Sequence, residues 1–392
     1  MTRQIFSALA FGAALALAAP GAQAEILALM NYESMTPDAV KALKLGAPQE
    51  RREALAVIDV DPQSPDFGRI VMEIPMPATQ VVHHIFYDRT MSKAYITALG
   101  QPSLQVLDLT RNPWRLSTIE VPGCQLGEDV IFDEQNEYWY LTCMQSAQVF
   151  KGEVATDKVV ATVSLPDSYP HGLGVSTAAN RILVTSTIDA GLTDPREIVT
   201  ELDATTLKIL GTHRLSMKPE PTGVAPVEIM FVPNADPPVA YVTTMFGGAL
   251  WAMTWDAATS TFKPEQVFDF ATLGAGVALE MYLSPNNDRL YVTTGAPGQL
   301  HVFDLSAGFT KPKLTASYAA AGGAHHVGFT KDGRYAFVQN SLLNLPNLAD
   351  GSVTVIDLQK GEVVASMDTL KNAGLTPNSL VLLPEWNDLA GH

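Results

Sequence analysis

The stretch DRLYVTTG at residues 288–295 has the composition of a β-strand, and five variants of it occur elsewhere in the chain. Its Tyr, Val, Leu and Thr residues suit a pleated surface that is half buried. A polar turn precedes most copies, and another strand, often ending in Asp-Leu, follows most of them. The other copies are SKAYITAL (92–99), NEYWYLTC (136–143), NRILVTST (180–187), PVAYVTTM (238–245) and GRYAFVQN (333–340). The chain is therefore a repeat of short strands.

Four short antiparallel strands per unit, repeated at roughly 40–50 residues, are typical of a β-propeller. The strands that open the units start near seven positions: His83, Glu128, His171, Glu228, Glu280, His325 and Asn378. This count predicts an all-β, seven-bladed β-propeller.

The last unit is incomplete, and strand-like runs at 25–31, 54–62 and 69–77 supply what it lacks. We therefore expect the N-terminal and C-terminal strands to share the closing blade. Between the first two of these runs, the sequence predicts a short helix with Thr36 as its N-cap and Pro37 in its first turn.

Residues 1–24 carry a single charge, Arg3, followed by an apolar stretch and a small-residue ending, Ala-Gln-Ala. This pattern predicts a secretory signal peptide. The apolar run is too short for a membrane span, so we expect no membrane insertion. The composition is typical of a bacterial protein. We predict one propeller domain over residues 25–392, located in the periplasm.

The net charge of −16 argues against nucleic acid and anionic membranes as partners. The only cysteines, Cys124 and Cys143, flank two strands joined by a polar turn, so they could meet across a hairpin. An oxidising compartment permits a disulfide between them. A copper-thiolate role is the alternative.

The seven opening positions are unusually polar. In a propeller, the innermost strand of each blade lines a central channel, so equivalent positions face a common point. All seven carry His, Glu, Asp or Asn, in a chain with only 17% charged residues. Histidine clusters suit Zn, Cu, Fe or Ni. The candidate metal ligands are His83, His84, His171, His325 and His326, and the candidate rim residues are Glu128, Asp129 and Asn378.

Alternation along a strand predicts that one histidine of each adjacent pair faces the channel, unless the backbone bends there. The plainer interpretation of each histidine is a hydrogen-bonded core residue. Glu228 and Glu280 lie in otherwise apolar strand openings, where a carboxylate needs a partner. We interpret them as candidate proton acceptors in catalysis. A structural hydrogen bond to a rim amide is the alternative.

Three stretches carry a family resemblance. Residues 55–77, LAVIDVDPQSPDFGRIVMEIPMP, followed by the pair at 83–84, resemble the selenium-binding protein/methanethiol oxidase family. APVEIMFVPNADPPVAYV (225–242) and AHHVGFTKDGRYAFVQNSLL (324–343) agree with it in the same order. The resemblance covers most of the chain and implies a seven-bladed propeller.

The resemblance also implies a copper-dependent oxidase that converts methanethiol, oxygen and water to formaldehyde, hydrogen sulfide and hydrogen peroxide. Its metal-binding histidines correspond to His83, His84 and His325 or His326. The chain departs from the family at one place. Where the family has a Trp-Asn-Ala-Cys-Ser-Ser-Cys run, this chain has IFYDRTMSKAY (85–95), without cysteine. Selenium binding through that run is therefore not expected.

The sequence leaves three hypotheses for function. The first is a copper oxidoreductase that uses oxygen on a small sulfur compound. The second is a non-catalytic periplasmic propeller that binds a protein or a metal. The third is a calcium-dependent hydrolase of the lactonase type, which the weight of histidine disfavours because calcium prefers oxygen ligands. The sequence shows no Ser-His-Asp order, phosphate-binding loop, haem site or dinucleotide fingerprint.

Overall fold

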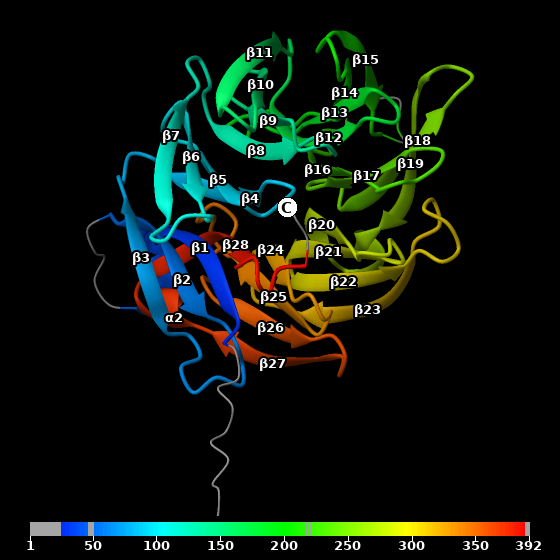
Figure 1. Ribbon diagram of the computed structural model, residues 1–392. Helices are drawn as coiled ribbons and strands as arrows, with labels where there is room; N and C mark the ends of the chain where they lie inside the picture. The colour runs from blue at the N-terminus through cyan, green and yellow to red at the C-terminus, as the bar shows by residue number, and fades with distance from the viewer. Residues whose placement is uncertain (1–24, 46–50, 217, 219–221, 389–392) are drawn as a thin grey trace, which may run out of the picture.

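The computed structural model describes residues 25–45, 51–216, 218 and 222–388. Within them, seven four-stranded antiparallel sheets are arranged around one axis (Figure 1). The all-β, seven-bladed propeller predicted from the sequence is confirmed. The predicted signal peptide at 1–24 lies outside the described residues.

Six blades are formed by consecutive strands, with the first strand of each nearest the axis (Figure 1). Their strands are β4 (Val82–Tyr87), β5 (Lys93–Ala98), β6 (Ser103–Asp108) and β7 (Arg115–Glu120); β8 (Gly127–Phe132), β9 (Tyr138–Cys143), β10 (Gln148–Glu153) and β11 (Lys158–Ser164); β12 (Pro170–Ser176), β13 (Arg181–Ser186), β14 (Ile198–Asp203) and β15 (Ile209–Arg214); β16 (Pro226–Phe231), β17 (Val239–Thr244), β18 (Ala249–Asp256) and β19 (Thr261–Asp269); β20 (Gly276–Leu283), β21 (Arg289–Ala296), β22 (Gly298–Asp304) and β23 (Lys313–Ala319); β24 (Ala324–Phe329), β25 (Tyr335–Asn340), β26 (Val353–Asp357) and β27 (Glu362–Met367).

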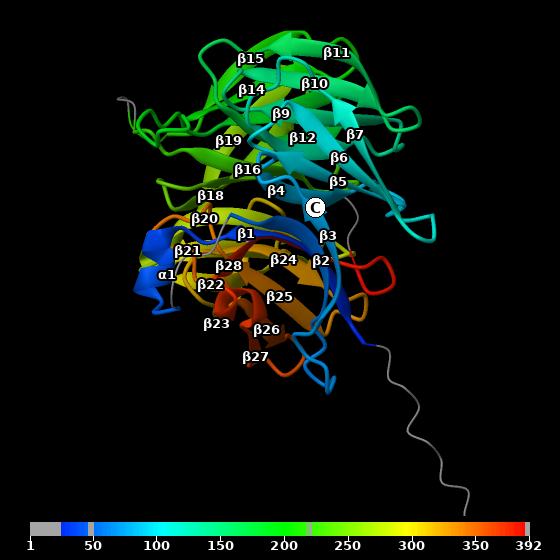
Figure 2. The same cartoon turned by 90° about the vertical axis from the view of Figure 1, so that its left-hand side faces the viewer.

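The closing blade combines the two ends of the described chain. Its strands, from the axis outward, are β28 (Leu375–Leu382), β1 (Leu27–Ser34), β2 (Glu53–Asp59) and β3 (Ile70–Met76). Strands β1 and β28 are antiparallel, with Met30 opposite Leu380. The blue and red ribbons accordingly lie side by side in Figures 1 and 2. This is the pairing that the incomplete last repeat predicted.

Helices are few and short in the described residues: α1 (Pro37–Ala42), the 3-10 helix η1 (Phe270–Leu273) and α2 (Thr369–Asn372). Thr36 caps α1 by accepting a hydrogen bond from the Ala39 N–H at 3.2 Å, as its sequence position predicted. None of these helices has the length and hydropathy needed to span a bilayer.

The apolar core lies between neighbouring blades. Phe86 and Tyr95 of one blade pack with Phe132 and Trp139 of the next, and all four are buried. Burial of each such side chain contributes about 1.5–3 kcal/mol. Gly152 makes room for this packing, because a Cβ atom there would lie 2.0 Å from the Trp139 ring. These contacts fix the angle between blades and therefore the positions of the inner strands.

Cys124 and Cys143 form a disulfide, with their Cα atoms 5.3 Å apart. It ties the turn before β8 to the end of β9. Both cysteines lie in the core between two blades. The bond resolves the alternatives that the sequence left open, because a disulfide sulfur is not available as a copper thiolate.

Candidate metal centre at the propeller axis

Each inner strand has a bulge where the polar residues occur. The ladder between first and second strands shifts register across two residues, for example between Val82 and Ile85. The same shift recurs in the other blades, and in the closing blade it lies between β28 and β1. A bulge leaves the extra residue out of the ladder and bends the strand. The bend allows two consecutive side chains to enter the axial cluster.

The histidine pairs show the consequence. The rings of His83 and His84 stack with centroids 3.7 Å apart, and those of His325 and His326 are 4.2 Å apart. All four are buried. Both members of each pair contact other axial residues. The alternation expected for a regular strand therefore does not apply here, because the backbone bends at this point.

A recurring side chain on the second strand holds each bulge in place. Thr243 accepts a hydrogen bond from the Glu228 N–H at 3.2 Å and donates one to the Leu279 carbonyl of the next blade at 2.5 Å. Such a residue satisfies buried backbone groups that the bulge removes from the ladder. The equivalent residues are Thr97, Thr142, Thr185, Thr293 and, with an amide in place of the hydroxyl, Gln339.

These threonines were missed as functional residues at the sequence level. Their residue type indicates only strand formation. Their signal was present in the sequence, since each threonine follows a pair of large apolar or aromatic residues at the same place in its copy of the strand, as in Tyr-Val-Thr. Three of them, Thr142, Thr185 and Thr243, donate a hydrogen bond to a backbone carbonyl of the next blade.

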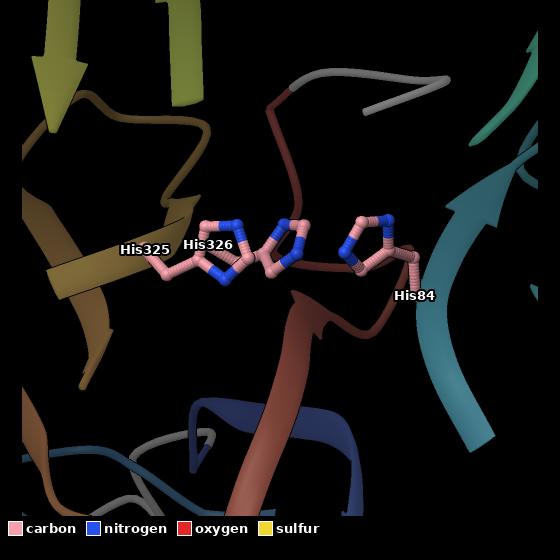
Figure 3. A group of neighbouring side chains, drawn as sticks. All are labelled: His84, His325 and His326. Carbon is pink, nitrogen blue, oxygen red and sulfur yellow. The ribbon is translucent and has the colours of Figure 1, made fainter. Parts of the chain in front are cut away.

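The first cluster, which we call the imidazole site, consists of His84, His325 and His326. Figure 3 shows the three rings converging from β4 and β24. One ligand nitrogen from each lies within 4.8 Å of the others. His84 Nδ1 is 3.2 Å from Asp129 Oδ1, which leaves His84 Nε2 without a hydrogen-bond partner among the described residues. A carboxylate behind a histidine ring is the usual support of a metal-binding imidazole.

The second cluster, which we call the carboxylate site, consists of Asp129, His171 and Glu228. Its ligand atoms also lie within 4.8 Å of one another. His171 Nδ1 is 3.1 Å from Glu228 Oε1, and His171 Nε2 is 3.8 Å from Glu128 Oε2. His171 therefore pairs with carboxylates, while its ring lies edge-on to that of His84 with the centroids 6.1 Å apart.

The remaining candidates connect these clusters. His83 Nε2 is 2.9 Å from Glu128 Oε2, and His325 Nε2 is 3.1 Å from Glu280 Oε1. The Asn378 amide nitrogen donates to the Val82 carbonyl at 3.0 Å, so it ties β28 to β4. The structure thus brings all five histidines and all four carboxylates into one contact network.

The pKa values of the axial residues follow from their burial and from their contacts with one another. Burial, reinforced by the neighbouring histidines, lowers the pKa of His84 well below its usual value. Burial also opposes the charged form of His171, but contacts with Glu228 and Glu128 raise its pKa to about 9. Burial together with Glu228, Glu280 and Glu128 raises the pKa of Asp129 well above its usual range. The imidazole site is therefore electrically neutral at its His84 end, while His171 carries a proton.

Glu128, the neighbour of Asp129 in the sequence, differs from it in the direction of its pKa shift. Burial tends to raise the pKa of Glu128, but the nearby His83 and His171 outweigh it and lower the pKa below its usual value. The pKa values of two adjacent acids on one strand are thus shifted in opposite directions. This follows from the bulge, which turns Glu128 toward His83 and Asp129 toward His84.

A cavity of about 470 Å³ reaches the axial residues from one end of the propeller. Its wall includes Met230, Phe231 and Tyr282, with Arg89 and Glu134 also contributing. Glu228 also lines it, and no other axial candidate does so among the described residues. A small molecule that entered this cavity would therefore meet Glu228 first.

Two histidines lie away from the axis, where each has a structural hydrogen bond. His301 is fully buried and hydrogen-bonds to Thr294 and Ser317. His213 lies on the outer strand β15, with Nε2 2.7 Å from Glu201 Oε2. They provide matched controls for the axial histidines.

Comparison with known proteins gives structural likenesses only. No protein-family model matches the chain, and no curated protein sequence matches it. A hypothetical selenium-binding protein from Sulfolobus tokodaii has a TM-score of 0.71 at 13% identity, covering 94% of this chain and 96% of that one. A Lactobacillus plantarum protein has a TM-score of 0.62 at 15% identity, and the match covers 92% of this chain and 100% of that one. Kuenenia stuttgartiensis hydrazine synthase has a TM-score of 0.59 at 13% identity, and the match covers 78% of this chain and 91% of that one. At these identities the likenesses show the propeller fold.

Proposed function

We propose that this protein is a periplasmic copper-dependent oxidoreductase of the methanethiol oxidase type, acting on a small thiol or related sulfur compound with oxygen. The observation that carries the proposal is the imidazole site, where three buried histidines from two blades bring ligand nitrogens within 4.8 Å of one another. The likeness to the selenium-binding protein structure and the sequence resemblance point in the same direction.

The donor set fits copper. Imidazole nitrogen suits Cu, Zn, Fe and Ni, whereas Ca²⁺ takes oxygen ligands. His84 is a neutral imidazole whose Nε2 has no hydrogen-bond partner among the described residues, while Asp129 holds the opposite ring nitrogen. These are the properties of a ligand prepared for a metal. The calcium-dependent hydrolase is disfavoured at this site for the same reason.

Copper bound there would supply one-electron transfer and oxygen chemistry that side chains cannot perform alone. The chain's own residues would bind and orient the substrate. The cavity is of a size for a small molecule, and the apolar part of its wall, formed by Met230, Phe231 and Tyr282, suits an apolar thiol. Glu228, at the inner end, would accept the thiol proton. Glu280 contacts His325 and lies outside that wall, so its role would be to position the imidazole.

The periplasmic location rests on two observations. The first is the signal-like composition of residues 1–24. The second is the disulfide between Cys124 and Cys143, a bond that persists in oxidising compartments. The mass of the mature chain and its recovery in the osmotic-shock fraction test this point, and a cytoplasmic chain that retains residues 1–24 would contradict it.

The decisive experiment is the metal content of protein purified from its native compartment, by elemental mass spectrometry with a paramagnetic resonance spectrum. We expect one copper per chain, with nitrogen couplings in the spectrum, and loss of that copper in His84→Gln/His326→Gln. His301→Gln is the matched control, because His301 is equally buried but off the axis. It should retain copper. Oxygen uptake with methanethiol then tests the reaction.

Copper-free protein that gains no tight site on reconstitution would refute the proposal. Copper binding without thiol-dependent oxygen uptake would refute the enzymatic part and leave a metal-binding propeller.

A further inference from the structure

The carboxylate site is distinct from the imidazole site in both its elements and its donors. Asp129, His171 and Glu228 come from the inner strands of three consecutive blades, β8, β12 and β16. The imidazole site comes from β4 and β24 and shares no ligand with it. Its donors are one nitrogen and two carboxylates instead of three nitrogens.

An independent observation concerns the partners of the two carboxylates at this site. Asp129 is fully buried, and its Oδ2 has no hydrogen-bond partner among the described residues. One oxygen of Asp129 lies within 4.8 Å of one oxygen of Glu228, so two buried acids lie close together. The ion pairs of Asp129 and Glu228 within the described residues are to histidines, with no Lys or Arg. Buried carboxylates in contact are costly unless a cation or a proton separates them.

The donor chemistry identifies the kind of cation. One imidazole and two carboxylates match the His and Asp/Glu ligands that Zn²⁺ takes in proteins. The two negative charges balance a divalent ion. We propose that Asp129, His171 and Glu228 form a second metal site, which takes Zn²⁺ or a similar borderline divalent cation, beside the imidazole site.

The two sites meet at one residue. Asp129 Oδ1 contacts the His84 ring at 3.2 Å, while Oδ2 has no such partner. A cation on the carboxylate site would therefore draw charge from the group that supports His84. The second site shares Glu228 with the proposed proton transfer, but it takes its own metal ion and binds it without copper, so it goes beyond the proposed function.

The test uses a full-length chain in which the imidazole site has been removed, His325→Asn/His326→Asn. After chelator treatment, this variant is titrated with Zn²⁺ alone, and binding is measured by calorimetry and elemental analysis. We expect one Zn²⁺ per chain. Adding Glu228→Gln should weaken that binding at least 100-fold, since it removes one of two charged ligands. Glu201→Gln, a buried carboxylate contacting a histidine off the axis, should leave it unchanged.

His171→Gln in the same background repeats the test with a partly exposed residue, in case Glu228→Gln fails to fold. Zinc-edge X-ray absorption should report nitrogen and oxygen ligands and lose the histidine signature in His171→Gln. A background variant that binds no Zn²⁺ overturns the proposal, and so does binding unaffected by Glu228→Gln and His171→Gln. Copper failing to bind the unaltered protein while Zn²⁺ binds here would refute the proposed function alone.

Discussion

The axial histidines and carboxylates, which we call the axial ring, and the contacts of Glu201, which we call the Glu201 cluster, both place histidine against buried carboxylate. The two sites differ in whether the carboxylate has enough hydrogen-bond donors. Glu201 is buried and accepts hydrogen bonds from Arg181 at 2.6 Å, Thr261 at 2.6 Å and His213 at 2.7 Å. Burial alone would raise its pKa, and these bonds instead lower the pKa to about 2. In the ring, Asp129 has a raised pKa and an unsatisfied oxygen. The comparison teaches that the same residue types serve stability when satisfied and invite a ligand when not.

The largest effect on stability is expected from a substitution that separates two inner strands of the axial ring and leaves the Glu201 cluster intact. A Cβ atom on Gly172 would lie 2.4 Å from the Val227 carbonyl oxygen and 2.8 Å from the Glu228 Cα, both of them backbone. Gly172→Ala should therefore separate β12 from β16 and destabilise the protein by about 3 kcal/mol. Chemical denaturation measures the loss. Gly211→Ala is the control, since nothing lies within 4 Å of its Cβ, and equal stability of the two variants would contradict the account.

Removing the charge from the satisfied cluster comes next. Glu201→Gln should cost about 2–3 kcal/mol at neutral pH, because Arg181 then faces a neutral partner in a buried site. The depressed pKa of Glu201 means that its stabilisation is present above pH 4.5 and is lost as pH falls toward 2. Urea denaturation between pH 2 and 6 should show that slope in the unaltered protein and less of it in the variant.

The control for this substitution is Glu265→Gln on the exposed face of β19, which should leave both stability and its pH slope unchanged. If Glu201→Gln behaved like Glu265→Gln, the hydrogen bonds to Glu201 would carry no net stabilisation.

Removing a threonine hydroxyl that holds a bulge should have a smaller effect on stability. Thr243→Val keeps the side-chain shape but removes the hydrogen bond that Thr243 accepts from the Glu228 N–H and the one that it donates to the Leu279 carbonyl. We expect a loss of about 1.5–2 kcal/mol, since two buried backbone groups lose their partners. Thr243→Ser retains the hydroxyl and should recover most of the loss in thermal and chemical denaturation. Serine and valine variants of equal stability would show that packing, rather than hydrogen bonding, sets the bulge.

The smallest effect has the opposite sign. In metal-free protein the raised pKa of Asp129 makes ionisation costly in the folded state, so its contribution to stability falls as pH rises above about 4. Asp129→Asn should therefore gain about 1 kcal/mol at pH 7. The gain should shrink toward pH 4, measured by denaturation after chelator dialysis. A variant less stable than the parent at pH 7 would show that Asp129 stabilises the empty ring, as Glu201 does its cluster.

The architecture was predictable because its signals are local. The Tyr-Val-Thr strands and their polar turns set both the strand period and the number of units. The seven opening residues, from His83 to Asn378, all lie on the inner strands as the repeat predicted. The missing strands of the last unit predicted the closing blade.

The detail of the site was not predictable to the same degree, because it depends on backbone bends. Alternation cannot tell whether both His325 and His326 turn inward, and the bulge between Ala324 and Val327 decides it. Nor does the sequence reveal that Glu228 meets His171 while Glu280 meets His325, since these contacts join different blades.

The closing blade has a consequence for the timing of biogenesis. Ile85, beside the first histidine pair, donates its N–H to the Ser379 hydroxyl, 294 positions later in the chain. At a synthesis rate of 5–20 residues per second, roughly 15–60 s separate the appearance of these two residues. Throughout that interval the nascent chain holds His83 and His84 without their neighbour on β28. The axial cluster is therefore complete only in chains synthesised through β28, and a stalled or clipped chain would present its histidines in an open ring.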